Sequence, residues 1–199
     1  MTPRPDILGI LVVGVGGQGA ITLARLLGEA AFAEGLPVRI GQIHGMSQRG
    51  GSVESSVVIG PGRSPFLPQR GADIVVALEP LELQRARPRL HPGTRVVVSS
   101  GQVVPTVLAL RGEDYPDTKG WLDELRPAVS ELVVVDGFAL ADAAGTRKAL
   151  GVAMLGALGC QAWLPFGPER IFETLAHRSR PSHREANRRA FAAGRRAAQ

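Results

Sequence analysis

The chain has 199 residues, of which 44% are hydrophobic and 21% charged, and its formal net charge is +5 at pH 7. This composition supplies enough apolar residues to enclose a core, and it excludes a fully disordered chain. The 25 glycines and 15 prolines favour a loop-rich globular protein. We therefore predict a single domain over residues 1–199, although two domains are possible at this length.

Signals for membranes and for disulfide or metal chemistry are missing from the sequence. No window approaches about 18 uninterrupted apolar residues, and the first six residues lack the apolar core of a secretory signal. We therefore expect a cytoplasmic protein with no membrane partner. Cys160 is the single cysteine, which excludes an internal disulfide, a cysteine zinc site and an iron–sulfur cluster held by thiolates of this chain. Any electron-carrying cluster must belong to a partner.

The first elements along the chain have the pattern of strand, glycine turn and helix. The apolar run from Ile7 to Val13 predicts a buried strand, and the glycine-rich stretch Gly14 to Gly19 separates it from a helical pattern that begins at Ala20. A second short strand is predicted at Val38 to Gln42. The polar, glycine-rich loop from His44 to Gly51 follows, and its composition differs from that of the rest of the chain.

The later elements alternate between strands and helices. Alternation from Val53 to Ile59 predicts a strand with one wetter face. Fully apolar runs, which are typical of strands buried on both faces, occur at Ile74 to Leu78, Val96 to Val98 and Leu132 to Val135. Helices are predicted at Pro80 to Arg87, Thr146 to Ala162, Pro168 to Ala176 and Ser182 to Arg196. The segment from Gly101 to Arg126 is predicted to be a long irregular connection.

This order predicts an α/β fold, a Rossmann-like open and mostly parallel sheet with helices on both faces. In such a sheet, ligands lie outside the carboxyl ends of the strands, where each predicted parallel strand here opens into polar or glycine residues. A dinucleotide site also needs an acid at the end of the second strand, but this chain has Gln42 there with Arg39 nearby. NAD binding is therefore not indicated.

The stretch Gly14-Val15-Gly16-Gly17-Gln18-Gly19 has the Gly-x-Gly-x-x-Gly spacing of a phosphate-cradling turn. In such a turn the glycines permit a tight bend and close approach of a ligand, while N–H groups and the helix dipole attract an anion. On spacing alone, these glycines could equally serve only to pack a strand closely against a helix.

Several polar side chains near the predicted strand ends are candidates for function. Arg49 could grip a carboxylate or phosphate through two hydrogen bonds, and His44 could donate to an anion or move a proton. Both also have structural interpretations, as a core histidine and as an arginine that reaches a partner subunit. Glu79 and Asp136 are interpreted as residues that favour a following helix N-terminus, and Cys160 as a small core residue.

Arginines crowd the segment Arg178 to Arg196, which contains the single acid Glu185. Such a segment can bind an anionic partner. The interpretation we favour is a capping box at Ser182 to Glu185 that opens a final helix, with only Phe191 available to stack on a base. The residues expected to face inward are Ala186, Ala190, Gly194 and Ala197. We therefore expect no nucleic-acid partner.

Four motifs together are more specific than the glycine turn. They are GVGGQG after the first strand, HGMSQRGGSVESSV in the loop and next strand, ADIVVALEPLE around Glu79, and N-x-x-A-F-x-x-G at Asn187 to Gly194. In this order they resemble the gamma-type catalytic domain of the 2-oxoacid:ferredoxin oxidoreductases, the pyruvate/ketoisovalerate type. The form His-Gly-Met-Ser-Gln-Arg-Gly-Gly is most similar to the small beta subunit of indolepyruvate ferredoxin oxidoreductase. The likeness extends from Ile7 to Gly194.

The resemblance implies a subunit, inactive alone, of a complex that oxidatively decarboxylates indolepyruvate or other arylpyruvates to acyl-CoA and passes electrons to ferredoxin. It implies that a larger partner subunit carries thiamine diphosphate and the iron–sulfur clusters, and that this chain binds no cofactor alone. Coenzyme A would be the co-substrate, with Arg49 as the anion grip. The phosphate cradle would then comprise Gly14, Gly16, Gly17, Gln18 and Gly19.

Other functions remain open at this point. A related aldehyde- or pyruvate-specific complex could have the same domain. A self-sufficient NAD(P)- or flavin-dependent oxidoreductase is supported by the glycine turn and opposed by the missing acid, while a nucleic-acid-binding protein rests on the segment Arg178 to Arg196 alone. The isolated chain could also form a homo-oligomer through the face that its partner would cover.

Overall fold

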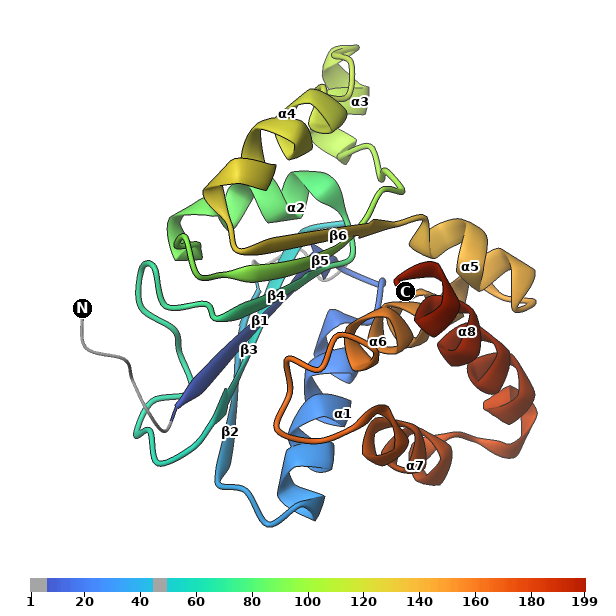
Figure 1. The fold of residues 1–199 in the computed structure, drawn as a ribbon. Coiled ribbons are helices and arrows are strands. Elements are labelled where there is room, and N and C mark those ends of the chain that lie inside the picture. Colours follow the sequence, from blue (N-terminus) through green and yellow to red (C-terminus); the bar gives the residue numbers. More distant parts are fainter. Residues whose placement is uncertain (1–6, 45–49) are drawn as a thin grey trace.

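The structure, a computed structural model, describes residues 7–44 and 50–199. In this part of the chain six strands form one sheet in the order β2-β3-β1-β4-β5-β6 (Figure 1). They are β1 (Leu8–Val15), β2 (Val38–His44), β3 (Ser52–Ile59), β4 (Ile74–Ala77), β5 (Arg95–Ser99) and β6 (Glu131–Val135). Neighbours among β1, β4, β5 and β6 are parallel, whereas β3 is antiparallel to both β1 and β2. The predicted fold class, an open and mostly parallel α/β sheet, is confirmed. The single domain over 1–199 stays a prediction.

Helices lie on both faces of this sheet (Figure 1). They are α1 (Ala20–Ala33), α2 (Pro80–Arg85), α3 (Thr106–Arg111), α4 (Thr118–Leu125), α5 (Gly137–Ala143), α6 (Leu150–Gly159), α7 (Pro168–Arg178) and α8 (Arg184–Ala197). Short 3-10 turns are η1 (Arg87–Arg89), η2 (Arg126–Ala128), η3 (Arg147–Ala149) and η4 (Pro181–His183). The buried residues of α1, α6, α7 and α8 pack on one face, and those of α2 and α4 on the other.

Strand β1 lies inside the sheet, and this position explains why its sequence is an apolar run. Its side chains alternate between the two faces, so Ile10 and Val12 pack with α1 and α6, whereas Leu11 and Val13 pack with α2. Strand β4 is buried at every position in the same way. Strand β6 was predicted to be buried on both faces, but it lies at the edge of the sheet and Val134 is 38% exposed.

The prediction that one face of β3 is wetter than the other is wrong. Ser55 and Ser56 are both buried, because β3 lies between β2 and β1 and the segment that follows it folds back over the strand. The Ser56 hydroxyl donates a hydrogen bond of 2.5 Å to the backbone oxygen of Pro65 in that segment. The Ser55 hydroxyl, in contrast, is buried without a hydrogen-bond partner among the described residues.

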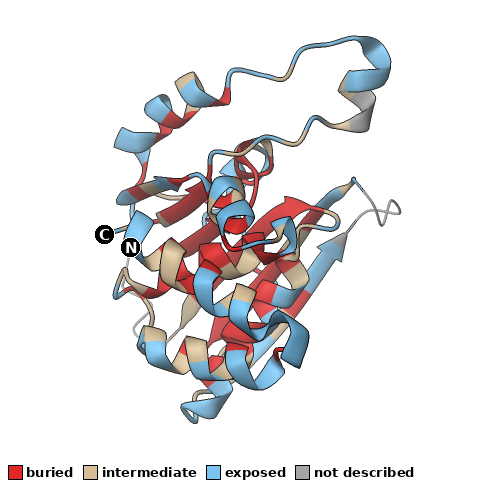
Figure 2. Cartoon of the chain, turned by 90° about the vertical axis from the view of Figure 1, so that its right-hand side faces the viewer, coloured by how far each residue is buried: buried red, intermediate tan, exposed pale blue. Residues whose placement is uncertain are grey.

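The predicted irregular connection from Gly101 to Arg126 is also wrong, because it contains α3 and α4. Helix α4 begins where the side chain of Asp117 accepts a hydrogen bond of 3.0 Å from the amide of Gly120, and it buries Leu122 and Leu125 against the sheet. Helices of six to eight residues are too short to establish a periodic pattern in the sequence. Figure 2 shows much of the segment before α4 as an exposed arm that extends from the body of the molecule.

The C-terminal helices differ in detail from the prediction. The expected capping box is absent, because η4 precedes α8 and the N-cap residue His183 makes no side-chain capping hydrogen bond. Ala190 and Gly194 are buried as expected, but Ala186 is half-buried and Ala197 is exposed. The predicted helix from Thr146 to Ala162 divides into η3 and α6. Cys160, which ends α6, is half-buried and is not a core residue.

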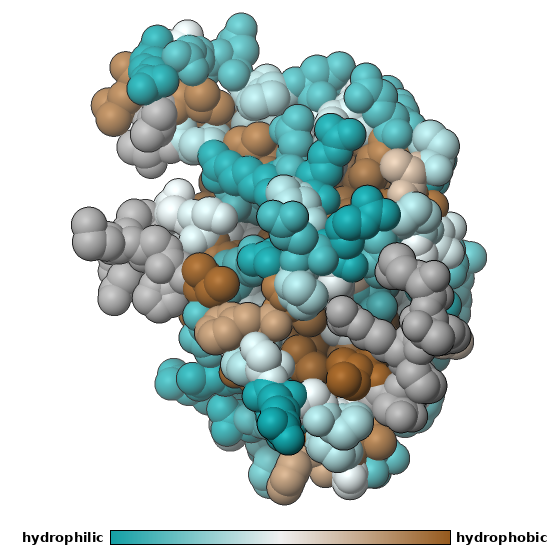
Figure 3. All heavy atoms as spheres, turned by 90° about the vertical axis from the view of Figure 1, so that its left-hand side faces the viewer, coloured by the Kyte–Doolittle hydropathy of each residue, from teal (hydrophilic) through white to brown (hydrophobic). Residues whose placement is uncertain are grey.

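Large apolar side chains that reach the surface are scattered over several elements. The exposed ones are Phe32, Ile43, Phe66, Val104, Leu110 and Val134. Figure 3 shows one side of the molecule, on which hydrophobic patches are set apart among hydrophilic side chains. Among residues 7–44 and 50–199, no helix combines the length and the apolar character that a membrane span requires.

Candidate functional site

The carboxyl ends of β1 and β4 define the candidate site. The chain leaves β1 through α1 on one face of the sheet and leaves β4 through α2 on the other, so the two connections diverge at these neighbouring strand ends, the usual position of a ligand in an open α/β sheet. Strand β2 runs in the same direction as β1, because both are antiparallel to β3. The glycine turn, the end of β2, the start of β3 and Glu79 therefore share one edge of the sheet.

The glycines of the turn have two different functions. Gly14 is buried within β1, and a Cβ atom there would lie 2.9 Å from the Gln18 Oε1 atom and 3.0 Å from the Leu78 Cβ atom, so this glycine permits close packing. Gly17 and Gly19 have φ angles of 103° and 91°, which disfavour any side chain, and among residues 7–44 and 50–199 no atom beyond the adjoining residues lies within 4 Å of a Cβ built at either. The second half of the turn therefore leaves open space beside its backbone.

The N-terminus of α1 lies directly behind this open space. The first N–H groups of a helix have no acceptor within the helix, and Gly19 as the N-cap offers no side-chain cap. No acidic residue occupies the first turn, so nothing there offsets the positive end of this 14-residue helix. The turn and the helix together have the geometry that favours an anion.

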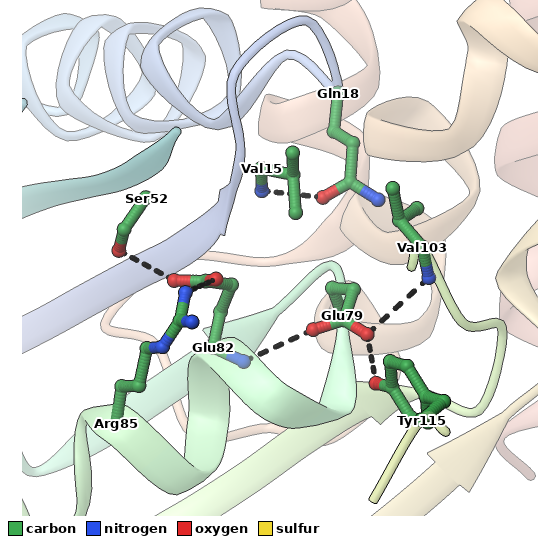
Figure 4. Close-up of polar contacts among 8 residues, drawn as sticks. All are labelled: Val15, Gln18, Ser52, Glu79, Glu82, Arg85, Val103 and Tyr115. Carbon is green, nitrogen blue, oxygen red and sulfur yellow. Dashed lines mark hydrogen bonds and ion pairs between the residues drawn. The ribbon is translucent and has the colours of Figure 1, made fainter. Parts of the chain in front are cut away.

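Gln18, predicted to contact a cofactor, forms a bridge within the protein. Its Oε1 atom accepts a hydrogen bond of 2.7 Å from the amide of Val15 (Figure 4), and its Nε2 atom donates one of 3.4 Å to the backbone oxygen of Leu78. The side chain thus joins the end of β1 to the residue that follows β4. Gln18 therefore fixes the shape of the glycine turn.

The end of the loop between β2 and β3 is hydrogen-bonded to the glycine turn. The amide of Gly16 donates to the oxygen of Gly51 at 2.8 Å, and the amide of Gly50 donates to the oxygen of Gly16 at 3.4 Å. Arg49 directly precedes this contact in the sequence, but Arg49 itself lies outside the described residues. The backbone of His44 ends β2 and pairs with Val53, and its side chain lies outside the described part of the structure.

Two residues near the predicted dinucleotide position lie elsewhere than expected. Strand β2 continues to His44, so Gln42 is an exposed residue within the strand. Arg39 lies near the other end of the strand, about 17 Å from His44 at 3.3 to 3.4 Å for each residue. Arg39 is therefore not close to the candidate site.

Glu79 caps α2, as its position before Pro80 predicts, and it also holds the exposed arm. Its carboxylate is fully buried and accepts hydrogen bonds from the amide of Glu82 at 3.0 Å, from the amide of Val103 at 3.4 Å and from the hydroxyl of Tyr115 (Figure 4). Burial raises the pKa of Glu79 above its usual value, although the hydrogen bonds oppose this shift. Burial and the neighbouring carboxylate also raise the pKa of Tyr115, so its hydroxyl stays a donor.

A second buried carboxylate, Glu82, links α2 to the start of β3. It accepts hydrogen bonds from the hydroxyl of Ser52 and, at 2.5 Å, from the Nη1 atom of Arg85 (Figure 4). Sequence reasoning missed both Glu82 and Tyr115 as parts of this edge. Tyr115 is the single tyrosine of the chain, but no spacing rule connects it to Glu79, 36 residues earlier.

The raised pKa of Glu79 predicts a specific dependence of stability on pH. Between its unfolded and its raised folded pKa, the folded chain binds more protons, so the free energy of unfolding falls as pH rises through this range. Urea unfolding of the Glu79→Gln variant over the same pH series should lack this contribution. The Tyr115→Phe variant loses a hydrogen bond that lowers the pKa of Glu79. In this variant the free energy of unfolding should therefore fall at higher pH. Identical pH profiles for wild type and Glu79→Gln would contradict the prediction.

The donor set of the chain does not fit an iron–sulfur cluster. Such clusters are typically held by four thiolates, and the sequence contains Cys160 alone. The described residues also contain no group of three or more His, Cys, Asp and Glu side chains suited to a metal ion.

Comparisons with known proteins agree on one family. The family model described as pyruvate ferredoxin/flavodoxin oxidoreductase matches residues 9–197. The indolepyruvate oxidoreductase subunit IorB of Archaeoglobus fulgidus is 38% identical over 168 residues, which cover 84% of each chain.

Two solved structures share the fold at lower identity. The gamma subunit of a keto/oxoacid ferredoxin oxidoreductase from Geobacter sulfurreducens superposes with a TM-score of 0.70 at 22% identity, and the match covers 96% of this chain and 98% of the other. The second is a 2-oxoglutarate:ferredoxin oxidoreductase from Magnetococcus marinus, solved with 2-oxoglutarate, coenzyme A and succinyl-CoA bound. Its TM-score is 0.72 at 19% identity. That match covers 97% of this chain and 31% of the longer one.

Proposed function

The chain belongs to the pyruvate ferredoxin/flavodoxin oxidoreductase family, and from this premise we propose that it is the small subunit of a ferredoxin-dependent 2-oxoacid oxidoreductase. The complex would oxidatively decarboxylate indolepyruvate, or another arylpyruvate, to the acyl-CoA in the cytoplasm. The observation that carries the proposal is the 38% identity, over 84% of both chains, to a subunit named for indolepyruvate oxidoreductase.

The redox groups would lie on a larger partner subunit. Thiamine diphosphate on that subunit would supply the decarboxylation chemistry, and its iron–sulfur clusters would take the electrons to ferredoxin. The single cysteine of this chain supports the assignment, because the chain cannot hold a cluster by thiolates. The chain would then be inactive alone.

The contribution of this chain would be to bind coenzyme A. A phosphate group of the ligand would lie beside Gly17 and Gly19, where the described residues leave space next to the positive end of α1. Arg49 would hold the same anion, since the residue that follows it is hydrogen-bonded to Gly16. Gln18 would position the turn through its bridge between β1 and β4.

A self-sufficient NAD(P)- or flavin-dependent enzyme is not favoured. An NAD site of this kind would need a carboxylate at the end of β2 for the ribose hydroxyls, and the strand ends in Gln42, Ile43 and His44. The family match also places the chain with ferredoxin- and flavodoxin-linked oxidoreductases.

Reconstitution tests the proposed function. The purified chain should show no dye reduction alone, and it should restore arylpyruvate-dependent and coenzyme A-dependent dye reduction when added to a purified cluster-bearing subunit. Pyruvate and 2-oxoglutarate serve as comparison substrates, and equal rates with either would reject the preference for arylpyruvates. Hydride transfer to NAD(P) by the lone chain, or a yellow flavin-containing preparation, would instead support the alternative function.

A further inference from the structure

A cavity of about 440 Å³ lies along α1 on the face that carries the C-terminal helices, and it gathers basic side chains from several elements. Arg25 comes from α1, Lys148 from η3, Arg178 from the end of α7 and Arg180 from the segment that follows. These residues are separated by up to 155 positions in the sequence. The fold therefore brings cationic side chains together around one concave surface.

The positive charge in this cavity is not balanced by the protein. Among the described residues that line it, Glu29 is the only acid, and its carboxylate lies 3.5 Å from the Nε atom of Arg178. Within the described part of the chain, Arg25, Lys148 and Arg180 take part in no ion pair. Like charges on a concave surface raise its potential and attract anions.

The wall beneath these cations is held in place by buried groups. Leu26 of α1 and Leu175 of α7 are buried and line the cavity. The hydroxyl of Ser179 donates to the oxygen of Leu175 at 2.6 Å and accepts from the Nδ2 atom of Asn187 at 2.8 Å, which joins α7 to α8. The cavity therefore has an ordered wall below a rim of long basic side chains.

Helix geometry adds to the preference for an anion. Helix α8 begins beside the cavity, and His183, its N-cap residue, makes no side-chain capping hydrogen bond. The positive end of this 14-residue helix therefore contributes to the potential of the cavity. The cavity follows α1 from Thr22 to Glu29, a distance of about 10 Å at 1.5 Å for each residue.

We propose that this cavity binds a small polyanion with one or more phosphate groups, held by Arg25, Lys148 and Arg180. Its volume of about 440 Å³ lies within the usual range of roughly 300–1,000 Å³ for small-molecule pockets. The site is lined by residues other than those of the glycine turn, so it does not depend on the proposed coenzyme A contacts. It also gives a function to the start of the arginine-rich segment.

Calorimetric titration of the full chain with inorganic pyrophosphate tests the site. Saturable binding is expected, and it should weaken as salt is raised from 50 to 200 mM (roughly the range in which phosphate contacts lose affinity). The double variant Arg25→Gln, Lys148→Gln should lose about tenfold or more in affinity, since hydrogen bonds between charged groups are strong. The control Arg111→Gln, Lys119→Gln removes the same charge from exposed residues of α3 and α4 and should bind like wild type.

Other results would overturn the proposal. No saturable binding would show that the cavity is not a site for such an anion. An equal loss of affinity in both double variants would show that pyrophosphate responds only to net charge. A loss in Gln18→Glu with no loss in Arg25→Gln, Lys148→Gln would place the ligand at the glycine turn instead. Tighter binding of a short single-stranded DNA than of pyrophosphate, abolished by Arg188→Gln, Arg196→Gln, would favour a nucleic-acid surface on α8. Circular dichroism of each variant verifies that it is folded.

Discussion

Replacing Gly194 by alanine should lower the free energy of unfolding by about 3 kcal/mol, the upper end of the usual cost of overpacking. A Cβ atom on Gly194 would overlap the backbone carbonyl group of Ala153 in α6. Backbone atoms cannot rotate away from such a clash as a side chain can. Helices α6 and α8 would therefore have to separate. This separation would weaken the packing of Phe191, a residue of α8, against the core.

Two further variants show that the cost comes from close helix packing. Gly156→Ala should be similarly destabilising, because its Cβ atom would overlap the backbone carbonyl group of Phe191 on the opposite helix. Gly151→Ala changes the same helix α6, but its nearest neighbours would lie at 3.8 Å. That variant should gain about 0.5–1 kcal/mol, the usual advantage of alanine over glycine within a helix.

Urea unfolding followed by circular dichroism measures all three variants. The midpoint should fall for Gly194→Ala and Gly156→Ala and rise for Gly151→Ala, with little change in the slope with denaturant. Equal stability of Gly194→Ala and wild type would mean that the two helices do not approach as closely as the structure indicates.

This contact explains the C-terminal motif N-x-x-A-F-x-x-G in structural terms. Ala190 and Phe191 are buried, Gly194 permits the close approach to α6, and Asn187 donates to Ser179 before α8 begins. The motif therefore holds the last helix against α6. Its spacing is visible in the sequence, but Ala153 is 41 positions away and no periodicity relates the two residues.

Local patterns were sufficient to locate the strands and the glycine turn, although not the position of β6 at the edge of the sheet. The apolar run that begins at Ile7 became β1, and the spacing of the glycines placed the turn between β1 and α1. Assignment of a function to each glycine required neighbours from elsewhere in the chain. Gly14 lies against Leu78, whereas the space beside Gly17 is open.

Long-range polar contacts could not be predicted in the same way. Glu79 was interpreted from its position before Pro80, and that local assignment as a helix cap is confirmed. Its contacts with Val103 and Tyr115 depend on how the exposed arm folds back to the sheet edge. The arm contains short helices with little repeating pattern, so the sequence alone does not specify this contact.

In the reconstituted complex, Arg49→Ala should raise the coenzyme A concentration for half-maximal rate by roughly tenfold to a hundredfold. This range corresponds to the roughly 1.5–3 kcal/mol that a hydrogen bond between charged groups contributes. The rate at saturating coenzyme A should change much less, because the proposed interaction binds the ligand and does not act on the reacting carbon. Arg63→Ala removes an exposed arginine after β3, at the opposite edge of the sheet, and should leave the titration unchanged.

Gly17→Ala tests the other half of the same proposed site, and Gly112→Ala is its matched control. Both glycines have a positive φ, 103° and 64°, and at neither would a Cβ atom meet an atom of the described residues within 4 Å, the adjoining residues aside. Each variant should therefore lose a similar stability, about 1–2 kcal/mol, for the left-handed backbone. Only at Gly17 would the added methyl group occupy the space proposed for a phosphate, so only Gly17→Ala should also weaken the binding of coenzyme A. If Gly17→Ala and Arg49→Ala both leave the coenzyme A titration unchanged, the glycines serve packing alone and coenzyme A contacts other residues.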